Sequence, residues 1–321
     1  MSHGVDIAVV GAASLAGELI IAELQQSDLP VHHLYPVDET EGSIEFAEQE
    51  VHFIEPAGFD FERADLVIFA EAGQALEASY EAARIAGCRV VNATGQYLPD
   101  APWALAELLD ADQFAVHDAL SSPTPVATIL ALLLAPLQRA FGPLDIDVTV
   151  LQAVSDAGKA GVEELAEQTR ALLTFRTPVT SVFEQRIAFN VVPRSCTDEE
   201  ISLWRQQLAE LAEVPADSLH LQVLWVPVFY GHGMLLRLRL PEVVSAEQVR
   251  EALLERDWIT LDAAGAAPGS PALTAAGSDD VRVNLLPASG ANDIHLWMVA
   301  DGQRRGLAAE AVKLASLLVK K

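Results

Sequence analysis

The sequence predicts an α/β protein of two domains: a Rossmann-like, doubly wound parallel sheet, followed by an α+β domain with a mixed sheet. Three observations support this fold class. The chain has 321 residues, which is more than a single hydrophobic core usually holds. A short apolar strand near the start runs into a turn that contains glycine. Further apolar strands then alternate with helical segments, which is typical of a parallel sheet covered on both faces.

The first strand, Val5–Val10, leads into the turn Gly11–Gly17 and a helical pattern that ends near Gln26. A strand, a tight turn and a helix in this order are typical of a dinucleotide-binding unit. Helical segments, notably Gly73–Ala86, separate the strands that follow. These strands are expected at Val31–Pro36, Val51–Ile54, Leu66–Ala70 and Arg89–Asn92, with a weaker one at Gln113–His117.

The second domain begins after a loop rich in serine and proline, Ser121–Pro125, which leads into an apolar helix over Val126–Phe141. Strands are expected at Asp145–Ala153, Ile187–Val192, Leu219–Tyr230, Met234–Leu240, Arg282–Leu286 and Ile294–Ala300. Helices are expected at Val162–Leu172, Thr197–Glu213 and Ala246–Arg256, and Ala264–Gly277 reads as a flexible loop. The final helix, Gly306–Leu318, should return to the first domain. The predicted domains are therefore 1–122 with 303–321, and 123–302.

Composition excludes several kinds of partner. The net charge is −26, from 46 acidic and 20 basic residues, so binding of nucleic acid through phosphate contacts is not expected. The simplest interpretation of the acidity is a solvated surface. No apolar run free of charge and proline is long enough to span a bilayer and no leader is recognisable, which predicts a cytosolic protein without membrane contact. The two cysteines, Cys88 and Cys196, have no disulfide or metal spacing, and no metal site is predicted.

Five segments, in order, resemble conserved blocks of the aspartate-semialdehyde dehydrogenase family and are most similar to its Usg-like branch. Pro125–Leu137 resembles the segment that carries the nucleophilic cysteine, and Gln152–Gly161 resembles the loop with an active-site glutamine. Val226–Gly233 resembles the block with the catalytic histidine. The two other blocks are Ile187–Pro193 and Trp297–Gly306. The resemblance implies a fold of the semialdehyde/glyceraldehyde-phosphate dehydrogenase type, with a second domain that forms a homodimer.

In the family, cysteine attacks an aldehyde, histidine takes the thiol proton, hydride passes to NADP, and phosphate releases the acyl group. The cysteine position is here Pro125, which has neither a nucleophile nor a backbone N–H. Gln152 and His232 occupy the family's glutamine and histidine positions. His232 is therefore either a general base or an ordinary polar residue of a pocket. Gln152 either helps to position the thioester and its water or phosphate partner, as in the family, or is a polar pocket residue.

The positions that hold anions in the family have also changed. Trp225 stands where the family has the arginine that binds the substrate carboxylate. Ser202 falls on a family lysine, and Tyr97, by a looser alignment, on the arginine that helps to bind phosphate. Each lost charged hydrogen bond typically removes ~1.5–3 kcal/mol. Aspartyl phosphate is therefore not the expected ligand.

The family's cofactor turn corresponds here to Gly11, Ala13, Ser14, Leu15, Ala16 and Gly17. Ser14 replaces the middle glycine, although its hydroxyl could donate to a phosphate, and the helix N-terminus favours anions. After the second strand comes Asp38, with no arginine or serine pair to receive a 2′-phosphate. NAD is therefore favoured over NADP, with Asp38 either binding a ribose hydroxyl or lying at the surface as an ordinary acid. The resemblance assigns Gly158 to the cofactor site and aligns Gly302 with an asparagine that faces the nicotinamide.

These features predict a semialdehyde dehydrogenase-like protein that lacks thiol-dependent activity and serves as a ligand-binding or interaction homologue. The alternatives are an active NAD-linked oxidoreductase for a different aldehyde or oxo substrate, and a purely structural protein. Cys88 should be a small buried hydrophobe, whereas Cys196 precedes a helix that could lower its pKa. A hydroxyl residue next to position 125 could pair with His232 as a nucleophile, but the sequence offers no third residue that would orient the histidine. The hydroxyl residues there are Ser121, Ser122 and Thr124.

Overall fold

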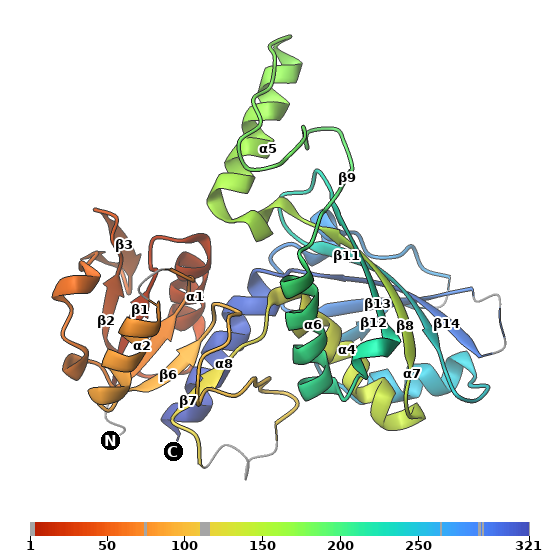
Figure 1. Ribbon diagram of the computed structural model, residues 1–321, viewed down its shortest axis with the longest axis horizontal. Helices are drawn as coiled ribbons and strands as arrows, with labels where there is room; N and C mark the ends of the chain where they lie inside the picture. Colours follow the sequence, from red (N-terminus) through yellow and green to blue (C-terminus); the bar gives the residue numbers. More distant parts are fainter. Residues whose placement is uncertain are drawn as a thin grey trace. The chain divides into compact units, whose positions relative to one another are not determined.

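The computed structural model describes residues 4–73, 76–109, 116–263, 265–287, 290 and 292–320 (Figure 1). The chain forms two compact units, one of residues 1–128 and 307–321 and the other of residues 129–306. The sequence places the divisions at 122/123 and 302/303. The first division instead falls within the first turn of helix α4 (Pro125–Phe141), because this helix starts in one unit and continues into the other.

The first unit contains a five-stranded parallel sheet in the order β2-β1-β5-β6-β7, which confirms the predicted Rossmann-like class. Its strands are β1 (Val5–Val10), β2 (Val31–Val37), β5 (Leu66–Phe69), β6 (Arg89–Asn92) and β7 (Ala119–Ser121). The helices are α1 (Leu15–Gln26), α2 (Leu76–Ile85) and α8 (Ala309–Val319).

Two cores lie on opposite faces of this sheet because alternate strand residues point to opposite sides. Val9 of β1 packs in one core with residues of α1 and α8, among them Leu24 and Leu314. Ala8, its neighbour in the strand, packs in the other core with Tyr80 and Ala83 of α2. The C-terminal helix α8 therefore belongs to the first unit, as the sequence predicts.

Two strand predictions in this unit need correction. The predicted strand Val51–Ile54 does not join the main sheet. Instead β4 (Gln49–His52) pairs with β3 (Ser43–Phe46) in a separate antiparallel sheet, and Ile54 forms only an isolated bridge to Val37. Both strands are largely exposed, so neither has the buried faces of a central parallel strand. The predicted strand Gln113–His117 lies largely outside the described residues, and the fifth strand is the buried segment β7.

The second unit contains a seven-stranded mixed sheet in the order β12-β13-β14-β11-β8-β10-β9, in agreement with the predicted α+β architecture. The strands are β8 (Asp145–Gln152), β9 (Val192–Pro193), β10 (Leu219–Trp225), β11 (His232–Arg239), β12 (Ile259–Leu261), β13 (Val281–Leu286) and β14 (Asp293–Ala300). The other helices are α5 (Gly158–Leu173), α6 (Asp198–Ala212) and α7 (Ala246–Leu254).

The predicted strand Ile187–Val192 is wrong, since only its last residue enters β9. Ile187 and Ala188 are buried in a small apolar cluster, and Phe189 has φ +55°, which interrupts an extended chain. The predicted flexible loop Ala264–Gly277 contains a π-helical turn at Pro271–Ala275, while residue 264 lies outside the described residues.

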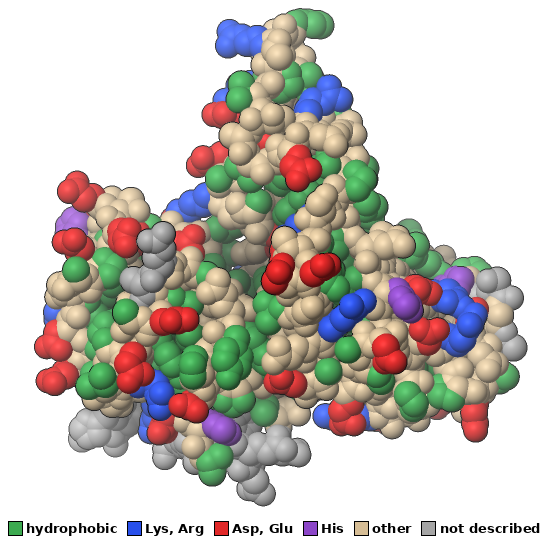
Figure 2. Space-filling view, viewed as in Figure 1, with side chains coloured by type: hydrophobic (Ala, Val, Ile, Leu, Met, Phe, Trp, Pro, Cys, Tyr) green, Lys and Arg blue, Asp and Glu red, His purple; other side chains and the backbone are tan. Residues whose placement is uncertain are grey.

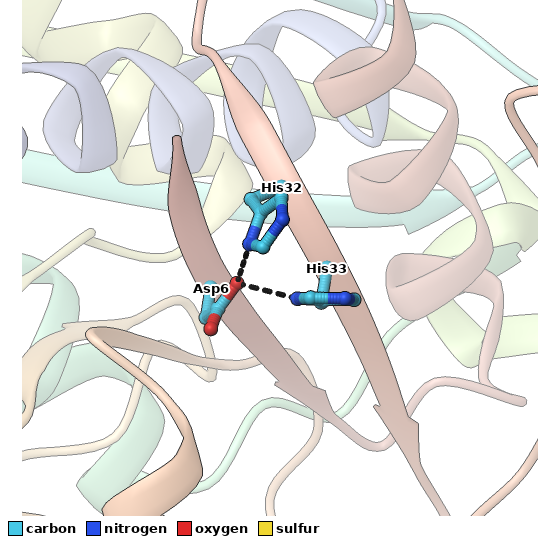
Figure 3. A group of neighbouring side chains, drawn as sticks. All are labelled: Asp6, His32 and His33. Carbon is cyan, nitrogen blue, oxygen red and sulfur yellow. Dashed lines mark hydrogen bonds and ion pairs between the residues drawn. The ribbon is translucent and has the colours of Figure 1, made fainter. Parts of the chain in front are cut away.

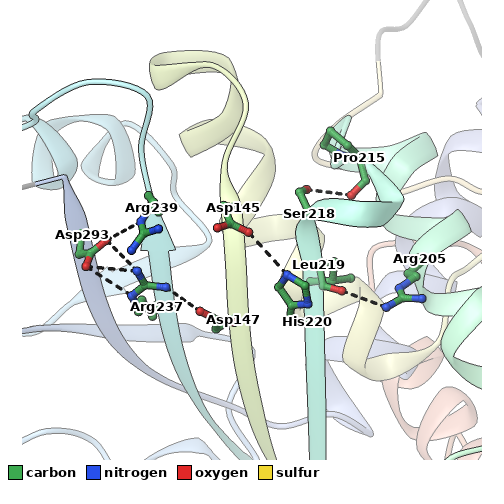
Figure 4. Close-up of polar contacts among 10 residues, drawn as sticks. All are labelled: Asp145, Asp147, Arg205, Pro215, Ser218, Leu219, His220, Arg237, Arg239 and Asp293. Atoms are coloured by element: carbon green, nitrogen blue, oxygen red, sulfur yellow. Dashed lines mark hydrogen bonds and ion pairs between the residues drawn. The ribbon is translucent and has the colours of Figure 1, made fainter. Parts of the chain in front are cut away.

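The two ends of this sheet differ in character. At one end Arg237 of β11 donates to Asp147 of β8 at 2.7 Å and to Asp293 of β14 at 3.2 Å, which joins three strands (Figure 4). The same end carries a contact of 3.7 Å between His220 and Asp145. The charged groups Arg237, Asp147 and Asp293 at this end are thus paired with one another.

The acidic side chains are dispersed over the visible surface (Figure 2). Figure 2 shows Asp and Glu side chains scattered over the visible face, with Lys and Arg between them, as expected for a solvated surface. Among the residues that the structure describes, no helix is both long and apolar enough to cross a membrane.

Candidate functional site

The strand register of the second unit brings the family-predicted residues together. Gln152 ends β8, and its Cα pairs with that of Trp225, which ends the parallel strand β10. His232 starts β11, which runs antiparallel to β8, so it lies at the same end of the sheet. The end of β14, at Ala300, pairs with His232. The ends of four strands therefore meet at one place, and two of them carry Gln152 and His232.

His232 is fully buried, and both of its ring nitrogens have polar neighbours. Nδ1 accepts a hydrogen bond of 3.1 Å from the backbone N–H of Ala153, which places the proton of the neutral ring on Nε2. Nε2 lies 3.1 Å from Oδ2 of Asp156, although the N–H is poorly aligned with that oxygen. Burial disfavours the imidazolium, but the carboxylate of Asp156 favours it more and raises the pKa of His232. The Ala153 N–H opposes protonation at Nδ1.

Asp156, in the short helical turn Val154–Ala157 after β8, links the two family residues. Its Oδ2 accepts a hydrogen bond from Nε2 of Gln152, and its Oδ1 accepts one of 2.9 Å from Nε2 of Gln303. Burial acts to raise the pKa of Asp156, but His232 and the two amide donors outweigh it, and the pKa is lowered. Gln152 and His232 are thus fixed by a single buried carboxylate.

A cation stands next to Trp225, and sequence reasoning did not find it. The guanidinium of Arg194 lies 5.2 Å from the ring centroid of Trp225, and its Nη1 donates to Oε1 of Gln152 at 3.2 Å. Nη2 donates to Oε1 of Glu200 at 2.5 Å. Although Trp225 itself carries no charge, Arg194 brings a positive charge to this place from the segment after β9. Glu200 balances that charge.

Gly302 is tightly packed against the ring of His232. A Cβ at this position would overlap Nε2 of His232 and lie 2.7 Å from its Cδ2. Real Cβ atoms essentially never approach this closely, so any side chain here would displace the ring. The glycine at the family's asparagine position and the inward placement of His232 are therefore sterically linked.

Helix α4 begins at Pro125, the residue that the resemblance aligns with the family's nucleophile. Proline is well suited to the first position of a helix, since its fixed φ fits and its missing N–H has no acceptor there. The substitution thus removes the nucleophile and keeps the helix start. Neither native thiol replaces it: burial raises the pKa of Cys88 to about 11, and burial also raises the pKa of Cys196 despite the nearby Arg194.

In the first unit the turn after β1 uses most of its own polar groups. The Ser14 hydroxyl donates to the carbonyl of Gly11 at 2.7 Å and accepts from the N–H of Gly17 at 3.0 Å, so it caps α1 and is not a spare phosphate donor. Oδ2 of Asp38 accepts the N–H of Ala13 at 2.8 Å. The N–H of Ser14 donates to the carbonyl of Gly11 at 3.1 Å, whereas the N–H groups of Leu15 and Ala16 form no hydrogen bond with the described part of the chain.

A cavity of about 370 Å³ opens beside this turn, at the carboxyl ends of β1, β2 and β5. Ligands of open α/β sheets bind at this end of the strands. The lining includes three carboxylates, those of Asp38, Glu39 and Glu71, together with Gly11 and Phe69. A cavity with this charge favours a ligand without an additional phosphate.

Comparison with known proteins decides the family. Residues 134–304 match the model described as "Semialdehyde dehydrogenase, dimerisation domain", and residues 6–116 match "Semialdehyde dehydrogenase, NAD binding domain". The chain belongs to the semialdehyde dehydrogenase family. A USG-1 protein homolog from Pseudomonas aeruginosa is 31% identical over 100% of this chain and 99% of the relative, and one from Azotobacter vinelandii is 33% identical with the same coverage. The crystal structure of aspartate semialdehyde dehydrogenase II from Vibrio cholerae, complexed with ASA, superimposes with a TM-score of 0.91 at 31% identity, covering 100% of this chain and 99% of that one.

Three further residues that the resemblance aligns with functional positions of the family have different surroundings. Gly158 has φ +69° at the junction between the turn Val154–Ala157 and α5, so a residue with a side chain would be strained there. Ser202 is exposed on α6, and Tyr97 is largely exposed in the first unit. Within the described part of the chain, neither side chain forms a hydrogen bond or ion pair that would compensate for the cations that the resemblance assigns to these positions.

Proposed function

We propose that this member of the semialdehyde dehydrogenase family does not carry out thiol-dependent dehydrogenation of aspartate semialdehyde, and instead binds a small ligand as a homodimer. One observation carries the proposal: helix α4 starts at Pro125, where the reaction needs a thiol. The raised pKa values of Cys88 and Cys196 support it, because at neutral pH both groups remain thiols rather than thiolates.

The surroundings of His232 support the same proposal. A general base must reach the proton that it removes, at about 2.6–3.2 Å or through one water. His232 is fully buried, with Nδ1 bonded to the Ala153 N–H and Nε2 against Asp156. This arrangement suits a structural histidine better than a base that acts on a substrate.

The expected ligand of the second unit is polar and carries little net charge. Arg194 is already paired with Glu200, so an anionic ligand would have to displace that carboxylate. Trp225 offers an aromatic surface beside the guanidinium, and Gln152 is fixed between Arg194 and Asp156. A neutral amide or a zwitterion fits these groups better than an aspartyl phosphate.

The test measures NADPH formation by the purified protein with aspartate semialdehyde, NADP and phosphate. No phosphate-dependent NADPH is expected above the rate without protein. Aspartate semialdehyde dehydrogenase II from Vibrio cholerae, assayed beside it, shows that the substrate and the detection are sound. Phosphate-dependent NADPH formation that persists after repurification would contradict the proposal.

A second candidate function, an NAD-linked oxidoreductase for another aldehyde or oxo compound, is favoured by the cavity at the carboxyl ends of β1, β2 and β5. The N–H groups of Leu15 and Ala16 can receive a pyrophosphate at the helix N-terminus, while Asp38, Glu39 and Glu71 disfavour a 2′-phosphate. Calorimetric titration with NAD and NADP is expected to give tighter binding of NAD. Binding of neither would remove this candidate, whereas NAD binding would justify an assay with a panel of aldehydes.

The homodimer is proposed to use an apolar arm, which we define as the exposed apolar residues of the segment from the end of α5 to residue 191. Helix α5 projects away from the sheet of its own unit (Figure 1). Phe175 is 100% exposed and Val179 is 77% exposed. Exposing a cluster of large apolar side chains to water is unfavourable and is typical of an interaction surface. The other members are Leu173, Val182, Phe189 and Val191. The family's dimerisation model spans the same segment.

Light scattering should give a mass twice the 34.4 kDa of the chain. The double substitution Phe175→Asp/Val179→Asp is expected to shift this mass to that of the monomer, because buried carboxylates oppose association. Leu273→Asp is the matched control, since Leu273 is 89% exposed in the same unit but lies outside the arm. A monomeric wild type, or a dimer unaffected by the double substitution, would rule out this interface.

A further inference from the structure

Asp6, His32 and His33 converge at the amino-terminal end of the first unit's sheet (Figure 3). Oδ1 of Asp6 lies 3.0 Å from Nδ1 of His32 and 2.9 Å from Nδ1 of His33. The three side chains are partly or well exposed, with side-chain exposures of 28%, 62% and 54%. We propose that these three residues form a binding site for a divalent transition-metal ion, and that Zn²⁺ fits it best.

A β-bulge explains how two consecutive histidines reach one carboxylate. In a regular strand, successive side chains point to opposite faces, so Asp6 would meet only one of them. Here Val5 pairs with Val31 but Asp6 pairs with His33, which leaves His32 as an extra residue in β2. A bulge of this kind redirects a side chain. The backbone of Gly4 passes close by, and a Cβ there would lie 2.6 Å from the Cβ of His32.

The donor set and its spacing suit zinc. The three ligand atoms all lie within 4.8 Å of one another. Ligands bound at about 2.0–2.1 Å in a tetrahedral site are roughly 3.3 Å apart, so the two distances from Asp6 to the histidines need to open by only a few tenths of an ångström. Two imidazole nitrogens and one carboxylate oxygen form a set that binds zinc and similar ions, whereas magnesium prefers oxygen ligands. Metal binding would replace the two protons now shared with Asp6.

The site is separate from the proposed functions. Asp6 lies near the start of β1, whereas Gly11 follows its other end, so about 16 Å of strand separates the cluster from the cofactor turn. Because the ion would join β1 to the edge strand β2, its binding should stabilise the first unit. The three ligands lie together whether or not a dinucleotide or a substrate binds elsewhere.

The experiment is calorimetric titration of the full chain, free of any polyhistidine tag, with Zn²⁺ at pH 7.5. One ion per chain is expected at this site, together with a higher melting temperature of the first unit. The substitutions His32→Asn and His33→Asn should each weaken zinc binding at least tenfold. His52→Asn is the control, because His52 is exposed on β4 of the same unit but outside the cluster. Co²⁺ should report tetrahedral geometry through its visible absorption, and Mg²⁺ should not bind.

Two results would overturn the proposal. The first is the absence of stoichiometric zinc binding by the wild-type chain. The second is zinc binding that the variant carrying both His32→Asn and His33→Asn retains at wild-type affinity, which would place the ion elsewhere. Since all three side chains are at least partly exposed, these variants should melt within a few degrees of the wild type without metal, and a loss of binding can be separated from a loss of fold.

Discussion

Asp156→Asn is expected to lower the free energy of unfolding by about 3 kcal/mol, because it breaks a buried charged network at its centre. The carboxylate of Asp156 receives amide donors from Gln152 and Gln303 and lies against Nε2 of His232. An asparagine would turn an NH₂ group toward at least one of these donors. Four of the five tryptophans, at 204, 225, 258 and 297, lie in the second unit, so urea denaturation followed by fluorescence reports on it.

The control for this substitution is Asp147→Asn, which removes the same charge at the opposite end of the sheet. Asp147 is 49% exposed and pairs with Arg237, so its loss should cost less than about 1 kcal/mol. The effect of Asp156→Asn should also depend on pH. Since Asp156 raises the pKa of His232, the stabilisation from their pairing should be larger at low pH and should fall as the pH rises through the folded-state pKa. Equal effects of both substitutions, or a larger effect of Asp156→Asn at pH 9 than at pH 6, would contradict this account.

Gly302→Ala is expected to destabilise the second unit by about 1–3 kcal/mol, because the added methyl overlaps the ring of His232. The measurement is urea denaturation followed by far-UV circular dichroism, which reports on both units. Gly58→Ala is the control, since a Cβ at Gly58 meets nothing within 4 Å and its φ is not in the left-handed region. It should change stability by less than about 0.5 kcal/mol.

A double-substitution cycle tests whether His232 is the cause. When His232→Ala removes the ring, the methyl of Gly302→Ala has space, so the double variant should be less destabilised than the sum of the single variants. Additive effects would mean that the clash lies elsewhere. The cycle also tests whether the glycine and the buried histidine depend on each other, as their packing indicates.

The sequence predicted the fold well where periodicity reflects burial. The buried strands β1, β5 and β6 and the apolar start of α4 were found within one residue. It failed at Ile187–Val192, where an apolar run packs as an irregular segment rather than in a sheet. Apolar character shows that a segment is buried, but it does not show which backbone hydrogen bonds the segment forms.

The candidate site was only partly accessible to sequence reasoning. Gln152 and His232 were found through family motifs, but their shared partner Asp156 has no pattern of its own. Arg194 is 42 residues from Gln152, and its contact depends on β9 and β10 pairing at the sheet edge. The Asp6–His32–His33 cluster escaped because its members are up to 27 residues apart and are joined by a bulge. Contacts of this kind arise from topology and register, which local spacing does not encode.

The start of α4 has a practical consequence for labelling chemistry. The two native cysteines have raised pKa values and should be slow to react at neutral pH. A cysteine introduced at position 125 would instead lie at a helix N-terminus, where the dipole stabilises a thiolate. A dye or spin label would then attach there with little background, and its signal would report directly on ligands that approach the first turn of this helix.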